Sequence, residues 1–284
     1  RHWKHGDCLE RWFNGGQDHV PWNSECGNDK QSPVNILTRQ VTYNESLKAF
    51  NFINYNVKSN RKWTMENNGH TGEEQESLIQ SGKVELGGLN GRYKAVQFHF
   101  HWGSEVGKTQ SPGSEHSIDG ERYPMEVKAL RNIPSPNSGI RKHVFKIYKV
   151  KVKVKVPLAH MKGVRSRVDI DIPALALESL IPDEKDLTSF YRYTGSLTTP
   201  GCNEEVVWTL FEKPIELGGE QIQEFWEKVY FDSEKKLPMV DNFRPVQPLG
   251  ARIVEKSNSN LLLPLRKALL LVPTAALLAF AWIS

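Results

Sequence analysis

The stretch Gln97-Phe-His-Phe-His-Trp102 alternates polar and aromatic side chains over its whole length. Side chains on a β-strand alternate between its two faces, so this pattern predicts a strand with Gln97, His99 and His101 on one face and three aromatic rings on the other. Two imidazoles that share a face can both reach one ion, which indicates a metal site. The alternative is a pair of core histidines with ordinary hydrogen-bond partners.

Five other short motifs accompany this stretch. They are Gln31-Ser-Pro-Val-Asn-Ile36, Asn67-Asn-Gly-His70, Gly113-Ser-Glu-His-Ser-Ile-Asp-Gly120, Gly195-Ser-Leu-Thr-Thr-Pro-Gly-Cys202 followed by Val206-Val-Trp208, and Asp241-Asn-Phe-Arg-Pro245. In this order the six motifs resemble those of an α-class carbonic anhydrase. The resemblance covers residues 19–128 and 172–254, and the positions of Cys26 and Cys202 beside the motifs are most similar to the secreted, membrane-anchored members.

The composition favours one large, β-rich domain over residues 1–256. The chain has 284 residues, of which 38% are hydrophobic, enough for a substantial core. Short β-prone runs and one amphipathic helical pattern are expected at Val84–Gly88, Tyr93–Trp102, Val206–Phe211, Gly250–Val254 (strands) and Gly219–Val229 (helix). The resemblance implies the architecture: a mostly β, α+β fold with a single, predominantly antiparallel twisted sheet and short flanking helices.

The resemblance also implies a reaction, the reversible hydration of CO2 to bicarbonate and a proton by zinc-bound hydroxide. Zinc is held there by three histidines. His99 and His101 match the first two ligands, and Gln97 and Glu126 match the groups that orient the ligands. Lys128 stands where the third histidine is expected.

Lys128 makes the competence of this chain an open question. A protonated lysine has no lone pair to donate and repels a cation. The rival hypothesis is therefore a catalytically impaired, carbonic-anhydrase-related binding protein. A third hypothesis makes His143 or His160 a replacement ligand, although neither has the flanking residues of the family.

The remaining site residues match the family pattern. Glu115 and Thr198 match the pair that orients the attacking oxygen, and His70 matches the proton shuttle, whose ordinary pKa of ~6.5 suits that role. The residues that match the substrate pocket are Thr199, Leu197, Val206 and Trp208. His116 matches a buried structural histidine, and Arg244 is expected to tie the C-terminal segment to the sheet.

Residues 129–171 diverge from the family pattern. Ala129–Pro136 resembles a stretch that the anchored members carry well downstream of the third ligand, and no motif is recognisable in Asn137–Asp171. A skipped exon followed by translated non-coding sequence is our hypothesis for this region. Within it, Lys149–Val156 alternates lysine and valine, which predicts a solvated edge strand or, as the sharper alternative, a polyanion-binding strip.

Three features bear on the compartment. The chain has three cysteines, which fit an oxidising compartment if two are paired; the resemblance implies a Cys26–Cys202 disulfide and leaves Cys8 over. Asn44-Glu-Ser46 is an N-glycosylation sequon.

The net charge of +4 gives no case for nucleic acid as a partner.

Residues 257–284 have the layout of a GPI-attachment signal. Small residues at Ser257 and Asn258 precede a spacer and the apolar stretch Ala268–Ser284. The alternative is a transmembrane helix, but this stretch is shorter than the ~20 residues of a usual span and contains Pro273. We therefore expect a GPI-anchored glycoprotein at the extracellular face of the plasma membrane, held to the membrane by lipid.

Overall fold

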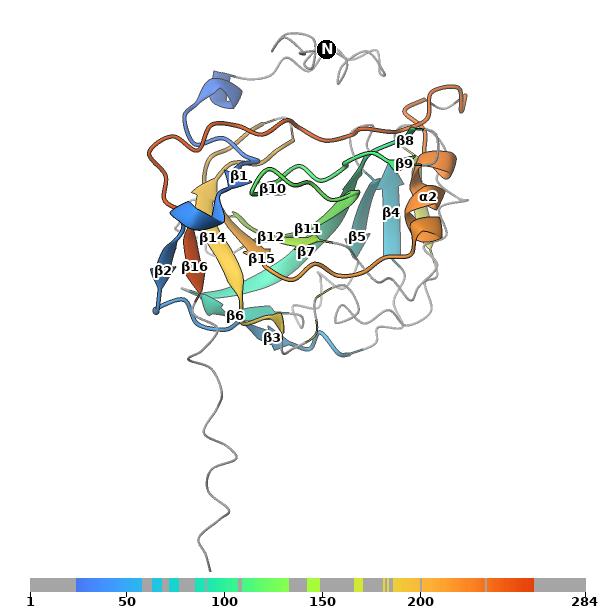
Figure 1. The fold of residues 1–284 in the computed structure, drawn as a ribbon. Coiled ribbons are helices and arrows are strands. Elements are labelled where there is room, and N and C mark those ends of the chain that lie inside the picture. Colours follow the sequence, from blue (N-terminus) through green and yellow to red (C-terminus); the bar gives the residue numbers. More distant parts are fainter. Residues whose placement is uncertain are drawn as a thin grey trace, which may run out of the picture.

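The fold is built around one large twisted β-sheet (Figure 1). The computed structural model describes residues 24–57, 63–67, 72–76, 85–89, 91–106, 109–132, 142–148, 166–170, 181, 183, 186–199, 201–232 and 234–257. Its strands are β1 (Asn35–Ile36), β2 (Thr42–Asn44), β3 (Asn51–Ile53), β4 (Trp63–Asn67), β5 (Gly72–Glu76), β6 (Glu85–Leu89), β7 (Gly91–Trp102), β8 (Glu105–Val106), β9 (Thr109–Gln110), β10 (Ser117–Ile118), β11 (Met125–Asn132), β12 (Lys142–Tyr148), β13 (Ser166–Ile170), β14 (Phe190–Gly195), β15 (Val206–Phe211) and β16 (Glu255–Ser257). The helical elements are the 3-10 turns η1 (Ser24–Gly27) and η2 (Thr38–Gln40) and the α-helix α2 (Gly219–Lys228).

Twelve strands form the main sheet. Its order is β13-β4-β5-β7-β11-β12-β15-β14-β16-β2, and β6 adds to β7 with β3 beside it. Most neighbours are antiparallel, but β12 with β15 and β16 with β2 are parallel. The sheet is therefore mixed rather than wholly antiparallel, which refines the expected fold class while keeping it mostly β.

The described side chains of β7, His99–Trp102, lie on two faces as the alternating sequence predicts. On its aromatic face, Phe100 and Trp102 pack against Phe225 of α2, with ring centroids 5.2 Å and 5.1 Å apart. Phe225 and Ile222 form the buried side of this helix. The predicted helix over residues 219–229 is thus confirmed, and it covers the face of β7 opposite the two histidines.

Strand β12 lies in the centre of the sheet, between β11 and β15. It is antiparallel to β11, with Lys128 opposite Lys146, and parallel to β15. The divergent region therefore contributes a central strand at the place where the sequence shows no motif. The predicted strand Lys149–Val156 lies outside the described residues.

The expected strand at Gly250–Val254 is wrong. Gly250 has a φ of +62°, and Arg252 N–H donates to Leu249 O at 3.3 Å, so this run is a turn. The strand begins after it, as β16, and the Thr42 N–H bond to Val254 O at 2.9 Å leads into the β2–β16 pairing.

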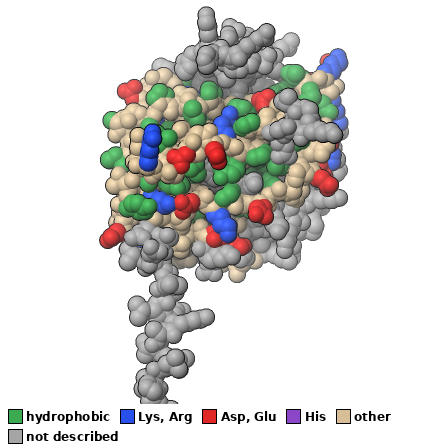
Figure 2. All heavy atoms as spheres, in the orientation of Figure 1, with side chains coloured by type: hydrophobic (Ala, Val, Ile, Leu, Met, Phe, Trp, Pro, Cys, Tyr) green, Lys and Arg blue, Asp and Glu red, His purple; other side chains and the backbone are tan. Residues whose placement is uncertain are grey.

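Two apolar clusters form the described core beside β14 and β15. The larger one consists of Val34, Ile36, Tyr191, Tyr193, Val206, Trp208, Leu210 and Val254, and the smaller one of Phe50, Leu187, Phe190 and Phe211. On the face drawn in Figure 2, acidic, basic and apolar side chains are interspersed among the coloured residues. Within the described ranges, the structure contains no helix long and apolar enough to span a membrane.

Candidate functional site

The register between β7 and β11 brings the candidate ligands together. Lys128 lies opposite His99, and Glu126 lies opposite His101. The two imidazole rings have centroids 5.4 Å apart and meet edge to face. The predicted histidine pair is therefore formed and buried, and Lys128 occupies the neighbouring strand position at which the third ligand was expected.

Lys128 is buried at the middle of a polar group that we call the central cluster: His99, His101, Glu115, Lys128 and Thr198. Its side chain is 1% exposed. Nζ donates hydrogen bonds to Glu115 Oε2 and to Thr198 Oγ1, and so bridges these two side chains. The ammonium also lies 4.0 Å from Glu126 Oε1 and 5.2 Å from the centroid of the Trp208 ring.

Glu115 is held from several sides. Its Oε1 accepts from the backbone N–H of Arg244 at 2.7 Å and lies 3.5 Å from His101 Nδ1. The nearer partner of His101 Nδ1 is the carbonyl of Asn242, at 2.7 Å. Because a carbonyl only accepts, Nδ1 carries the proton and the lone pair of His101 is on Nε2, the atom that would face a metal.

Glu126 has a different set of partners. Its Oε2 accepts from the backbone N–H groups of Glu115 at 2.6 Å and His116 at 3.0 Å, and its Oε1 bonds to His116 Nδ1 at 3.1 Å. His116 Nε2 in turn bonds to the Tyr193 hydroxyl at 2.5 Å, which bonds to Ser32 Oγ at 2.9 Å. His116 is therefore a buried structural residue, as the sequence predicts.

Burial dominates the electrostatics of this network. It lowers the pKa of His99 well below the ordinary value, and the nearby His101 and the Lys128 ammonium lower it further. Burial raises the pKa of Tyr193 well above its ordinary value, against the opposing effect of the Ser32 hydrogen bond. His99 is consequently neutral near pH 7, and Tyr193 keeps its hydroxyl proton there.

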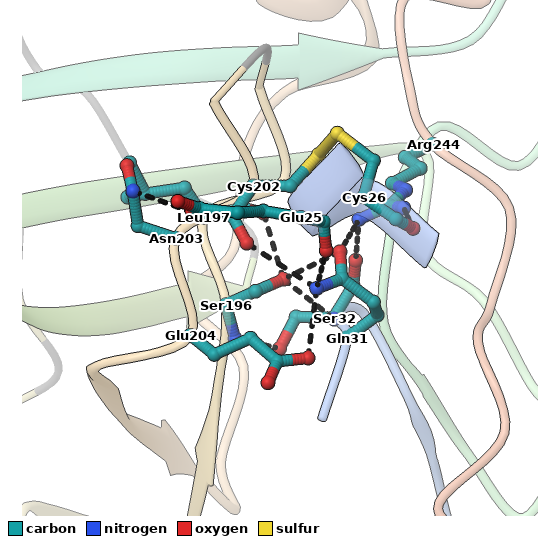
Figure 3. The surroundings of a disulfide bond; sticks show 10 residues. All are labelled: Glu25, Cys26, Gln31, Ser32, Ser196, Leu197, Cys202, Asn203, Glu204 and Arg244. Atoms are coloured by element: carbon teal, nitrogen blue, oxygen red, sulfur yellow. Dashed lines mark hydrogen bonds between the residues drawn. A yellow bond between two sulfur atoms is a disulfide. The ribbon is translucent and has the colours of Figure 1, made fainter. Parts of the chain in front are cut away.

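The loop that carries Thr198 is anchored by a disulfide (Figure 3). Cys26 and Cys202 are bonded, as predicted, and Leu197 N–H donates to Asn203 O at 2.9 Å. Gln31 Nε2 donates to Cys202 O at 3.2 Å. This anchored loop presents Thr198 to Lys128.

Arg244 joins the same corner rather than the sheet. Its guanidinium donates to Gln31 Oε1 and Ser32 O, both at 2.9 Å, and to Cys26 O at 3.3 Å (Figure 3). The expectation that Arg244 ties the C-terminal segment to the sheet is therefore wrong in its partner, because the guanidinium ties this segment to the N-terminal residues Cys26, Gln31 and Ser32. We call this group around Cys26, Cys202, Gln31, Ser32 and Arg244 the disulfide corner.

The predicted pocket residues form part of the core. Val206 and Trp208 are each 1% exposed, and Leu197 packs against the same apolar cluster. Thr199 follows Thr198 in the anchored loop, where its carbonyl accepts from Cys202 N–H at 3.1 Å. Trp208 also donates from Nε1 to Ser196 O at 3.0 Å, so it supports this loop directly.

Several predicted residues lie beyond what the structure describes. His70, Cys8, His160 and Asn258 are outside the described residues, and Gln97 and His143 are described only through their backbones. Gln97 pairs with Leu130 and Gln75, and His143 with Arg131 and Val207.

Sequence reasoning missed the backbone contacts of the segment Asp241–Pro245. The carbonyl of Asn242 fixes the His101 tautomer, its side chain accepts from Trp102 N–H at 2.7 Å, and the N–H of Arg244 holds Glu115. The motif itself was the available signal, but a motif gives residue types and not which backbone groups point inward.

The residues present do not fit a three-ligand zinc site. Two imidazoles supply suitable nitrogen donors, but the third neighbour is an ammonium that is already bonded to Glu115 and Thr198. Among the residues that the structure describes, no group of three or more His, Cys, Asp or Glu side chains is arranged to hold a metal ion.

The similarity to known proteins extends over most of the chain. A family model described as eukaryotic-type carbonic anhydrase matches residues 15–136 and 145–258, which includes much of the region without recognisable motifs. Carbonic anhydrase 4 of Rattus norvegicus is 38% identical over 276 residues, covering 92% of this chain and 87% of the relative. Carbonic anhydrase 4 of Oryctolagus cuniculus is 39% identical (90% and 85% covered), and carbonic anhydrase 12 of Homo sapiens is 28% identical (88% and 73%). Taken with the mostly β fold and the histidine pair on β7, these matches show that the chain belongs to the eukaryotic-type carbonic anhydrase family.

Proposed function

We propose that this protein acts in the reaction of its family, the reversible hydration of CO2 to bicarbonate and a proton, with zinc affinity and turnover strongly reduced by Lys128. Family membership supports carbonic anhydrase activity. The reduction rests on one observation: the Lys128 ammonium bonds to both Glu115 and Thr198. In the family these two side chains orient the attacking oxygen.

The chemistry of the donors supports weak metal binding. A structural zinc site with a full set of ligands contributes on the order of 10 kcal/mol, so loss of one ligand costs several kcal/mol of affinity. Like-charge repulsion from the neighbouring ammonium adds to that loss. His99 and His101 remain the proposed ligands, with Gln97 and Glu126 as the groups behind the ligand positions.

The other proposed roles concern substrate and proton. Val206, Trp208 and Leu197 are the proposed apolar neighbours of CO2, and their side chains belong to the core cluster or pack against it. Thr199 is the proposed hydroxyl partner of bicarbonate, and His70 is the proposed proton shuttle. Each of these roles comes from the resemblance of the motif that carries the residue.

Zinc content and hydration rate, measured on the same purified full-length protein, test the proposal. We expect well under one zinc per chain and CO2 hydration reduced by at least about 100-fold relative to rat carbonic anhydrase 4 assayed in parallel, because a change of ~2.7 kcal/mol in transition-state stabilisation has this effect. Lys128→His should raise zinc content, and His99→Ala in that background should remove the gain. Ordinary activity that a chelator abolishes would contradict the proposed role of Lys128.

A metal-free binding protein is the second candidate. The observation that favours it is the buried ion pair, which satisfies Lys128 and Glu115 internally. This candidate predicts no zinc and no hydration in the wild-type chain even at high zinc concentration, whereas the first candidate predicts residual hydration that rises with added zinc.

We further propose that the protein is extracellular and attached to the membrane by a GPI lipid. The Cys26–Cys202 disulfide supports an oxidising compartment. Of the two candidate attachment residues, Ser257 is 1% exposed and bonded through Oγ to Thr188 O and Phe190 N–H at 2.7 Å and 2.9 Å, which favours Asn258. Release from cells by a phosphatidylinositol-specific phospholipase tests the anchor; protein that stays on the membrane and retains residues 261–284 would support the transmembrane alternative.

Asn44 is the proposed glycosylation site. Its Nδ2 donates to Glu255 Oε1 at 2.6 Å, and its Oδ1 accepts from Ser46. A glycosylated asparagine keeps one N–H, so the contact with Glu255 is compatible with the modification. A mass shift on glycosidase treatment that is absent in Asn44→Gln would support this site.

A further inference from the structure

Two carboxylates lie buried side by side in the centre of the molecule. The Glu115 and Glu126 side chains are each 0% exposed. A buried carboxylate without compensation costs several kcal/mol, so the fold needs donors or positive charge at this place. In a zinc enzyme, a bound metal ion supplies positive charge nearby.

The two carboxylates are compensated in different ways. Glu126 receives two backbone N–H groups and the His116 ring. Glu115 receives one backbone N–H, from Arg244, and its other oxygen is bonded to Lys128. Lys128 is therefore the charged side chain that is hydrogen-bonded to Glu115 in the described structure, and its Nζ lies 4.0 Å from Glu126 as well.

The surroundings of Lys128 contain several groups that attract a cation. Its side chain is among the largest fully buried ones in the described structure. The ammonium has a carboxylate and a hydroxyl as acceptors and lies 5.2 Å from the Trp208 ring centroid, where the ring attracts positive charge. Burial of an unpaired lysine is strongly unfavourable, but these partners compensate the charge of Lys128.

The histidines, too, have partners apart from any metal. His101 is held through Nδ1 by the Asn242 carbonyl, and its ring contacts that of His99. Thr198 is held by Lys128 on an anchored loop. Every described side chain of the central cluster thus has a contact within the protein that helps to fix its position.

We infer that Lys128 is the built-in cation of the central cluster: its ammonium takes the structural place of the metal ion, and the protein folds and keeps this cluster intact without bound metal. The groups that contact the Lys128 ammonium form a site that would suit a primary ammonium ion. This inference goes beyond the proposed function, because it concerns stability, which is measured separately from hydration.

Thermal unfolding of the full chain with and without a chelator tests the inference. The wild-type melting temperature should not change on chelation or on addition of zinc. Lys128→Met should lower it by on the order of 10 °C, because Glu115 is left buried without its cation. Adding Glu115→Gln to Lys128→Met should recover most of that loss, since the uncompensated charge is then removed.

A matched control comes from a lysine that lies closer to solvent than Lys128. The Lys256 side chain is 17% exposed and bonds at 2.6 Å to Glu212, which is 42% exposed, so solvent can replace part of this contact. Lys256→Met should therefore shift the melting temperature by only a few degrees at most. If Lys128→Met yields no folded protein, soluble yield replaces melting temperature as the readout, and the double variant should restore it.

Chemical rescue separates the charge of Lys128 from its packing. In Lys128→Ala, added propylammonium should raise the melting temperature, and the uncharged analogue propanol at equal concentration should not. A wild-type protein that melts earlier after chelation, a Lys128→Met variant as stable as wild type, or equal effects of the two additives would each overturn the inference. Hydration activity is measured separately, so failure of the proposed function leaves these outcomes unaffected.

Discussion

The central cluster and the disulfide corner each contain a buried cation, but the cations do different work. Arg244 in the corner donates mostly to neutral acceptors: the amide oxygen of Gln31 and the carbonyls of Ser32 and Cys26. Lys128 in the central cluster bonds to a carboxylate and to the hydroxyl of Thr198. Both regions meet at Glu115, which accepts from the Arg244 backbone and from the Lys128 side chain.

The two cations differ in what they hold together. In the corner, a planar guanidinium joins chain segments that are far apart in sequence, a role that needs its fork of donors. In the central cluster, a compact ammonium sits among side chains that the family uses for catalysis. The Arg244 guanidinium connects backbone segments, whereas the Lys128 ammonium bonds to two side chains that are candidate site residues.

Among the changes that test this comparison, removal of the disulfide should have the largest effect on the free energy of unfolding. Cys26 and Cys202 are 176 residues apart, so their bond constrains a very long loop of the unfolded chain. Replacing both by serine should lower the free energy of unfolding by about 5 kcal/mol in the chain-entropy model. Urea denaturation of the oxidised wild type and the double variant measures this difference.

Cys8→Ser is the matched control for that measurement. We predict that Cys8 is free or pairs outside this chain, so its replacement should leave the urea midpoint unchanged. A Cys8–Cys26 link in non-reduced peptide mapping would contradict both the disulfide assignment and the resemblance to anchored members.

Arg244→Ala, which removes the guanidinium donors from the disulfide corner, should have a smaller effect on the free energy of unfolding. Loss of three charge-assisted hydrogen bonds that leaves buried acceptors unsatisfied should cost about 3 kcal/mol of unfolding free energy. Arg252 also donates to three carbonyls, of Leu249, Pro248 and Thr194, but closer to solvent. Arg252→Ala should therefore cost only about 1 kcal/mol, and equal losses would remove the distinction.

The smallest effect should be pH-dependent and should arise at a surface ion pair. Partial burial raises the pKa of Glu212, but hydrogen bonds from Lys256 and Ser189 outweigh this effect and leave the pKa below its ordinary value. The stabilisation is therefore fully present above the ordinary carboxyl pKa and is lost as pH falls through the lowered one. Because Glu212 is 42% exposed, the loss should stay below about 1 kcal/mol.

Unfolding free energies of wild type and Glu212→Gln between pH 6 and pH 3 check this value. The stability difference between the two proteins should shrink as the pH falls. A difference that grows toward acid would contradict the direction of the pKa shift.

Much of this architecture could be predicted because its signals are local or carried by motifs. The alternation in residues 97–102 predicted the divided faces of β7, the helical pattern predicted α2, and the motifs predicted the Cys26–Cys202 bond. The motifs also placed Lys128 at the third ligand position, and in the structure it pairs with His99. The pairing register of two strands is set by their hydrophobic patterns and by the turns between strands.

Other features depend on contacts that a sequence does not display. Strand β12 has no motif, and its central place is decided by pairing with two neighbours. Gly250 adopts a positive φ, so the run Gly250–Val254 begins as a turn and not as the expected strand. Lys128, Glu115 and Thr198 lie on three separate segments, and their contact depends on how these segments pack. The sequence therefore indicated that the third zinc ligand is missing, but not that Lys128 bonds to Glu115 and Thr198.

The buried ion pair has a consequence for the evolutionary history of this chain. A lysine codon and a histidine codon differ at more than one base, so a return to a histidine at position 128 passes through another residue, such as Asn or Gln. Such an intermediate would have neither the ammonium nor a full set of metal ligands, and Glu115 would lose its charged partner. If Lys128 is the built-in cation inferred above, selection for stability would oppose the first step toward histidine and would favour retention of the lysine.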